Sequence, residues 1–137
     1  MKQLILAVLI CVAWWMPAQS DEVRNPQIRS VIAGQIEAFK DEDLGRAYGY
    51  ASDAIHQMFR TPEIFGHMVE KGYPMVYRPV QVMFLELDEE DGALWQKVEI
   101  RDKAGRFHIL AYEMIDTAQG WKIDGVKYLG KGPGMGA

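Results

Sequence analysis

The sequence predicts an α+β fold in which N-terminal helices pack on one face of a curved, four-stranded antiparallel meander. Apolar residues recur at helical spacing up to about residue 72, and from Tyr73-Pro74 onward the apolar period changes to two. The breaks within the second half are short and contain glycine, which favours hairpins between neighbouring strands. Because all the helices precede all the strands, the helices are expected to share one face of the sheet.

Three helices and one short helical turn are expected before residue 73. Asn25-Pro26 predicts the first start, a capping side chain followed by proline at the first helical position, and Thr61-Pro62 repeats the signal for the third helix. Ser52-Asp53 is expected to cap the single turn, and Gly72 is placed to end the third helix. The residues expected to face the core are Ile28, Val31, Ile32, Gln35, Ile36, Phe39, Leu44, Ala47, Tyr48, Ala51, Ile55, Met58, Phe59, Ile64, Phe65, Met68 and Val69.

Four strands are expected over residues 77–87, 94–101, 106–115 and 121–129. Pairing of Ile115 with Gly120 in the last hairpin would place Val126 and Tyr128 on a mixed outer face, either half exposed or in an oligomer contact. Residues 21–129 are then a single domain, and residues 130–137 a loose tail. The same pairing would turn seven residues toward the helices: His108, Leu110, Tyr112, Met114, Trp121, Ile123 and Gly125.

Residues 1–20 are typical of an export signal. Lys2 precedes an apolar run over residues 4–16, and Ala18 and Ser20 provide a small-x-small cleavage site before Asp21. The run would span about 20 Å as a helix, short of the roughly 30 Å hydrocarbon core of a membrane. We therefore expect cleavage near Ser20-Asp21, a periplasmic or secreted domain and no stable membrane insertion afterwards, with an uncleaved anchor as the alternative.

Composition excludes several classes of function. The chain has 15 basic and 19 acidic residues and no basic stripe, which argues against a nucleic-acid partner. Its one cysteine, Cys11, would leave with the signal, so the expected mature domain has no disulfide. His56, His67 and His108 lack metal-ligand spacing, so no metal or other cofactor is expected.

Two residues are candidates for acid/base catalysis. His108 shares the expected helix-facing side with Tyr112 and would titrate near neutral pH, although a structural, hydrogen-bonded role is the preferred interpretation. Asp53 is the second candidate, with helix capping as its preferred role. Glu86 and Glu99 alternate with apolar residues on their strands and are expected to face solvent.

Residues 24–129 resemble the nuclear-transport-factor-2-like (cystatin-like) superfamily, and within it a bacterial exported family of domains of unknown function. The resemblance rests on residues 35–44, a helix ending in an acidic turn, on residues 48–55 and 65–69, and on the closing Gly-Trp-Lys-Ile-Asp-Gly-Val of residues 120–126. It implies a curved sheet wrapped on helices around an apolar pocket. Isomerases and dehydratases of the superfamily place an aspartate or histidine base opposite an aromatic hydroxyl, for which the counterparts here are Asp53 or His56 with Tyr48, Tyr112 or Tyr128.

The leading hypothesis is a non-catalytic domain that binds a small apolar ligand or a protein partner. The alternatives are a small-molecule isomerase or lyase with His108 or Asp53 as base, and a structural accessory module that forms a homodimer. This superfold hosts all three kinds of function, so the resemblance does not choose between them. The residues expected to line the pocket are Tyr48, His108, Leu110, Tyr112, Met114, Trp121 and Ile123.

Overall fold

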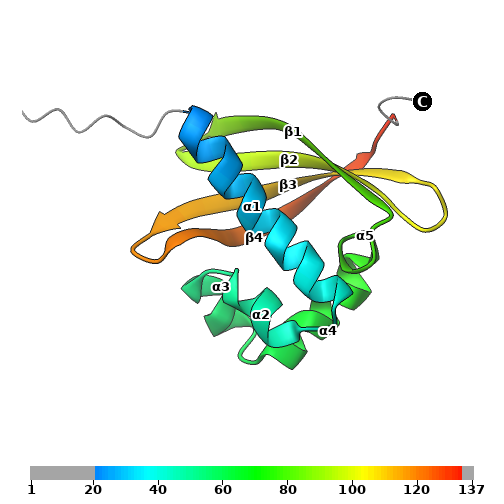
Figure 1. The fold of residues 1–137 in the computed structure, drawn as a ribbon, viewed down its shortest axis with the longest axis horizontal. Helices are drawn as coiled ribbons and strands as arrows, with labels where there is room; N and C mark the ends of the chain where they lie inside the picture. Colours follow the sequence, from blue (N-terminus) through cyan, green and yellow to red (C-terminus); the bar gives the residue numbers. More distant parts are fainter. Residues whose placement is uncertain (1–20, 134–137) are drawn as a thin grey trace, which may run out of the picture.

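The computed structural model describes residues 21–133, and it confirms the predicted α+β fold (Figure 1). The predicted signal peptide, its cleavage site and residues 134–137 of the predicted tail lie outside these residues. Helices come first and the four strands follow. The elements are α1 (Asp21–Lys40), α2 (Leu44–Gly49), α3 (Asp53–Met58), α4 (Pro62–Gly72), α5 (Pro74–Tyr77), β1 (Gln81–Glu90), β2 (Ala93–Arg101), β3 (Phe107–Thr117) and β4 (Gly120–Lys131).

Helix α1 crosses one face of the sheet, and the shorter helices gather around its C-terminal end beside β4 (Figure 1). Its predicted inward stripe is confirmed, because Ile28, Ile32 and Phe39 have no exposed surface. The predicted start at Asn25-Pro26 is wrong, since α1 already begins at Asp21. Pro26 fits inside the helix because its fixed φ is helical and its missing N–H costs one hydrogen bond near the N-terminal end. None of the helices in residues 21–133 is long and apolar enough to cross a membrane.

The predicted caps of the short helices are present, with two corrections. Ser52 Oγ accepts the Ile55 N–H at 3.3 Å, and Thr61 Oγ1 accepts the Ile64 N–H at 3.2 Å. The capping role expected of Asp53 therefore belongs to Ser52, and Asp53 is an exposed residue of the first turn. Two residues expected to face the core are largely exposed instead, Ile64 at 53% and Met58 at 68%. Helix α4 uses the residues after Ile64, from Phe65 on, to reach the core.

The four strands form an antiparallel meander in sequence order, as predicted. The register of the last hairpin differs from the prediction, because Gly120 pairs with Thr117 and not with Ile115. Asp124 is an extra residue between the Met114–Ile123 and Glu113–Gly125 pairs. A bulge of this kind reverses the alternation of the residues after it. Val126 therefore pairs with Tyr112 and Tyr128 with Leu110, so both lie on the helix side rather than on the predicted outer face.

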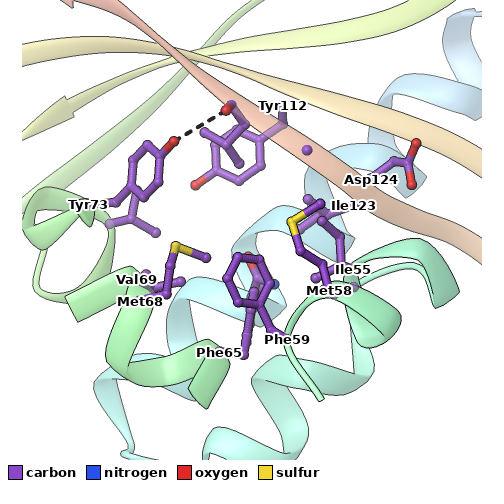
Figure 2. Close-up of a pocket in the computed structure, with 15 residues that line it drawn as sticks. Ile55, Met58, Phe59, Phe65, Met68, Val69, Tyr73, Tyr112, Ile123 and Asp124 are labelled. Atoms are coloured by element: carbon purple, nitrogen blue, oxygen red, sulfur yellow. Dashed lines mark hydrogen bonds between the residues drawn. The ribbon is translucent and has the colours of Figure 1, made fainter. Parts of the chain in front are cut away.

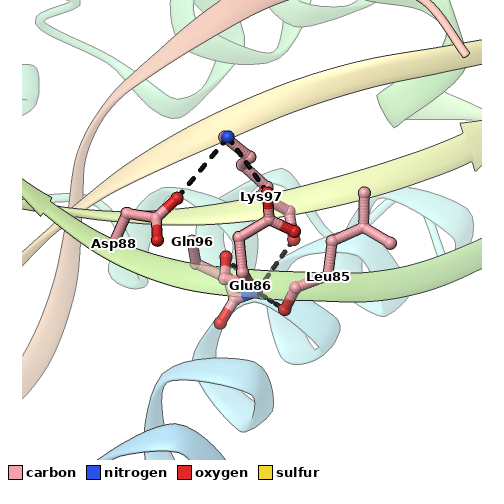
Figure 3. A network of polar contacts seen from close by, with 5 residues as sticks. All are labelled: Leu85, Glu86, Asp88, Gln96 and Lys97. Carbon is pink, nitrogen blue, oxygen red and sulfur yellow. Dashed lines mark hydrogen bonds and ion pairs between the residues drawn. The ribbon is translucent and has the colours of Figure 1, made fainter.

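Another bulge interrupts β1, where Leu85 and Glu86 oppose a single residue of β2. The buried Gln96 side chain fills the gap, its Nε2 donating to the carbonyl oxygens of Leu85 at 2.9 Å and Lys97 at 2.8 Å (Figure 3). Lys97 lies across the same bulge with its Nζ 3.1 Å from Glu86 Oε1 and 3.5 Å from Asp88 Oδ2. The network replaces ladder hydrogen bonds that the bulge removes.

Both ends of the strand region depart from the prediction. The strand expected from Tyr77 starts at Gln81, because residues 74–77 form the turn of helix α5 after Pro74. At the other end β4 runs to Lys131, and the Gly132 N–H donates to the Phe107 carbonyl at 2.8 Å, so the sheet takes in the start of the expected tail. Glu99, expected in solvent, is 3% exposed, and its carboxylate lies under this C-terminal segment.

Candidate functional site

A cavity of about 270 Å³ lies between α3, α4 and the middle of β3 and β4 (Figure 2). Helix α3 supplies Ile55 and Met58, and α4 supplies Met68 and Val69. Fifteen residues line the cavity, most of them apolar or aromatic: Gln35, Ala51, Ile55, Met58, Phe59, Phe65, Met68, Val69, Tyr73, Val76, Tyr112, Ile123, Asp124, Gly125 and Val126.

The segment between α2 and α3 is attached to β4 and holds the cavity wall in place. The Ile123 N–H donates to the Tyr50 carbonyl at 3.0 Å, and the Ser52 N–H donates to the Ile123 carbonyl at 2.8 Å. The Ser52 hydroxyl also donates to Asp124 Oδ1 at 2.6 Å. Ser52 thus caps α3 and links it to the bulge on β4. These hydrogen bonds fix the position of α3 against the sheet, although the helix has no fully buried residue of its own.

One polar group at the cavity lacks a hydrogen-bond partner. The hydroxyl of Tyr112, a residue with no exposed surface, has no hydrogen-bond partner within residues 21–133. The Tyr73 hydroxyl, in contrast, donates to the Val126 carbonyl at 3.4 Å, and Gln35 Nε2 donates to the Ala47 carbonyl at 3.2 Å. Figure 2 shows the Tyr73 and Tyr112 rings side by side beneath the sheet.

The electrostatics of the cavity favour uncharged groups. Burial raises the pKa of the Tyr112 hydroxyl well above its ordinary value, and the nearby Tyr73 raises it further, so Tyr112 is a neutral phenol at physiological pH. No Lys, Arg or His is found among the lining residues of the described chain, and Asp124 is the one carboxylate. That carboxylate accepts a hydrogen bond from the Ser52 hydroxyl. In Figure 2 it lies to the right of Ile123, away from the Tyr73 and Tyr112 rings.

The structure brings together only part of the predicted pocket. Tyr112 and Ile123 line the cavity, whereas Leu110 and Met114 are buried in the sheet–helix core beside it. Trp121 lies near the start of β4 in a separate groove, where its Nε1 donates to Gln27 Oε1 at 3.2 Å.

Tyr48 lies behind the wall rather than in it. Its hydroxyl donates to the Phe59 carbonyl at 2.7 Å, and its ring stacks on His56 with 3.8 Å between centroids. His56 Nε2 in turn donates to the Tyr48 carbonyl at 2.6 Å. The stacked rings and their hydrogen bonds hold the connection between α2 and α3 together, which is a structural role for both residues.

His108 lies away from the cavity, at the far end of β3. Its Nε2 is 2.8 Å from Asp102 Oδ2, and its Nδ1 is 2.9 Å from the Tyr128 hydroxyl. Asp102 also accepts the backbone N–H groups of Ala104 and Arg106 in the β2–β3 turn. The hydrogen bond from His108 is the main reason that the pKa of Asp102 lies below its ordinary value, and the two backbone donors lower it further. The arrangement ties the turn to β4, the hydrogen-bonded role that the sequence favoured for this histidine.

The cavity walls from α3 and α4, together with Tyr73, were not among the predicted pocket residues. The periodic apolar pattern placed Ile55, Phe59, Met68 and Val69 in the core, because a residue that packs and a residue that borders a cavity have the same spacing. Helical periodicity therefore does not separate these wall residues from residues of the filled core. No cluster of three or more metal-ligating side chains occurs in residues 21–133.

Comparison with known proteins identifies a family without identifying an activity. Residues 21–133 match the family described as Domain of unknown function (DUF4864), a match that spans the whole described region. No curated protein matches the sequence. The chain therefore belongs to the DUF4864 family.

Proposed function

We propose that this protein is an exported, non-catalytic domain of nuclear-transport-factor-2-like fold that binds a small apolar ligand in the cavity between α3, α4 and the sheet. The observation that carries the proposal is the cavity itself, about 270 Å³ with largely apolar walls. Concave, mostly apolar sites with few polar groups are the usual form of small-molecule sites. Helices followed by a four-stranded meander, with a cavity between them, support the superfamily relationship.

The isomerase or lyase alternative receives less support from the geometry. Its two candidate bases, His108 and Asp53, are absent from the cavity lining. His108 has both ring nitrogens engaged by Asp102 and Tyr128, and Asp53 is exposed on α3. A base has to come within hydrogen-bond reach of the proton that it removes, so neither residue serves a substrate held in this cavity.

The accessory-dimer alternative would require a continuous apolar surface. The large exposed apolar residues of the described chain are Met58 on α3, Ile64 on α4, Val80 just before β1, and Tyr128 and Leu129 on β4. They are spread over two helices and both edges of the sheet, which gives this alternative less support.

Native mass spectrometry of the protein purified from its own host tests the proposal. We expect a chain that starts at Asp21 and carries a non-covalent adduct of low mass. The variant Val69→Phe fills the cavity from α4 and should lose the adduct, whereas Ile64→Phe adds the same ring on the exposed side of the same helix and should retain it. An adduct that survives Val69→Phe, or a bare wild-type mass, would contradict binding in this cavity. An intact Met1 would contradict cleavage of the signal.

A further inference from the structure

We propose that the ligand is an uncharged molecule with one hydrogen-bond acceptor, such as a ketone, aldehyde or ester oxygen, which accepts a hydrogen bond from the Tyr112 hydroxyl. The inference rests on the proposed function, because it concerns the chemistry of a ligand in the same cavity. It specifies two properties that the apolar walls alone do not require, one hydrogen-bond acceptor and no net charge.

The donor is identified by the hydrogen bonds around the cavity. The Tyr73 hydroxyl donates its one proton to the Val126 carbonyl oxygen, and the Gln35 amide donates to the Ala47 carbonyl oxygen, so both side chains already have a partner. The Tyr112 hydroxyl has no acceptor in residues 21–133, although the residue is fully buried. Buried polar groups nearly always have partners, and an unpaired one is costly. A phenylalanine would fill nearly the same volume without that cost. An acceptor atom on a ligand would supply the hydrogen-bond partner that the hydroxyl lacks.

The absence of a net charge on the ligand follows from the lining. A ligand carboxylate or phosphate would lose its hydration on entering the cavity and would find no cation there, because the described lining has no Lys, Arg or His. Burial of an unpaired charge is costly. An ammonium or guanidinium group has donors only, so it could pair with Asp124 but could not accept a hydrogen bond from Tyr112. The Tyr112 phenol keeps its proton at physiological pH, so it acts as a donor to a neutral acceptor.

The volume limits the size of the ligand. A cavity of about 150 Å³ lined by aliphatic and aromatic side chains holds a benzene ring. At about 270 Å³ the cavity has room for one ring with a short substituent. Contact with the buried hydroxyl also requires a wall side chain to move, and Met68, beside Tyr73 in Figure 2, is suited to this because its thioether is unbranched and flexible.

A pair of ligands with nearly the same shape provides the test. Acetophenone carries a ketone oxygen where α-methylstyrene carries a methylene group, and benzoate carries a charge. Dissociation constants of the three probes are measured by NMR titration for the wild-type chain, Tyr112→Phe and the matched control Tyr73→Phe. Tyr112→Phe should weaken acetophenone binding about threefold to tenfold relative to its effect on α-methylstyrene, the range expected for one hydrogen bond. Tyr73→Phe should leave the ratio unchanged, and benzoate should bind more weakly than acetophenone.

The outcomes separate the inference from the proposed function. If both neutral probes bind and Tyr112→Phe changes their affinities equally, the hydrogen bond is refuted while apolar binding stands. Tighter binding of benzoate than of acetophenone would refute the uncharged ligand. If neither neutral probe binds the wild-type chain, the cavity does not accept small apolar molecules, and the proposed function fails together with the inference. Thermal melting of each variant verifies that it is folded.

Discussion

Replacement of Tyr112 by phenylalanine should stabilise the ligand-free protein. The hydroxyl of Tyr112 is buried without a partner in residues 21–133, and a buried unsatisfied polar group costs about 1–3 kcal/mol. Phenylalanine keeps the ring, which is fully buried and pairs across the sheet with Gln96 and Val126. Allowing for some relaxation around the site, we expect a gain of about 1–2 kcal/mol, or a rise in Tm of roughly 3–8 °C for a domain of this size.

Urea denaturation followed by far-UV circular dichroism measures this effect directly. The midpoint should rise with no change in the m-value, because the surface exposed on unfolding is nearly the same in both proteins. Tyr73→Phe is the control, since it removes a hydroxyl from the same cavity that already donates to the Val126 carbonyl. That variant should lose up to about 1 kcal/mol of stability.

The result that would refute this reasoning is a loss of stability in Tyr112→Phe. A loss of about 1 kcal/mol or more would mean that the hydroxyl makes a favourable hydrogen bond in the native protein. A gain in Tyr73→Phe equal to that in Tyr112→Phe would show that aromatic packing, and not the unpaired hydroxyl, determines the change.

Three further predictions concern polar side chains outside the cavity centre. Ser52→Ala should cost about 2–4 kcal/mol in urea denaturation, because it removes both the α3 cap and the hydrogen bond to Asp124. Gln96→Leu should cost about 2–3 kcal/mol and increase amide hydrogen exchange at the β1 bulge, since the carbonyl groups of Leu85 and Lys97 lose their donor. Asp102→Asn should lower the urea midpoint at pH 7, with the deficit vanishing in acid. The folded pKa of Asp102 lies below the unfolded value of about 3.9, so its stabilisation is present above that pH and is lost as the pH falls through the folded pKa.

Each of these predictions has a contradicting outcome. An Asp124→Asn variant as unstable as Ser52→Ala would place the effect in the Asp124 contact and remove the role of the cap. Unchanged exchange at the β1 bulge in Gln96→Leu would mean that the amide of Gln96 does not hold it. A deficit of Asp102→Asn that persists after the pH has fallen through the folded pKa of Asp102 would show that the carboxylate charge is not its source.

Several structural features could be predicted because they depend on neighbouring residues in the chain. The Thr61-Pro62 start of α4 and the inward stripe of α1 follow from capping chemistry and helical spacing. The order of the meander follows from short breaks that leave no length for a crossover. The export signal of residues 1–20 remains a prediction, since it lies outside the described residues.

The candidate site could be predicted only in part. Tyr112 and Ile123 were expected at the pocket because strand alternation places them on the helix side. The bulge at Asp124 reversed that alternation for Val126 and Tyr128. It forms where Ser52 links α3 to β4, a contact between distant residues that no local sequence pattern predicts. Glu99 was assigned to solvent on the same alternation, but the C-terminal segment covers the outer face there.

By itself the sequence determined the class of the fold, the order of the four strands and the buried face of α1, because these depend on residues within a few positions of one another. Only the tertiary structure decided where packing leaves a cavity and which buried hydroxyl is left without an acceptor. Both depend on distances between α3, α4 and β4, and a change of one residue in strand register alters them. Apolar spacing describes a filled core and a lined cavity equally well, so the unpaired Tyr112 hydroxyl becomes visible only when all its neighbours are in place.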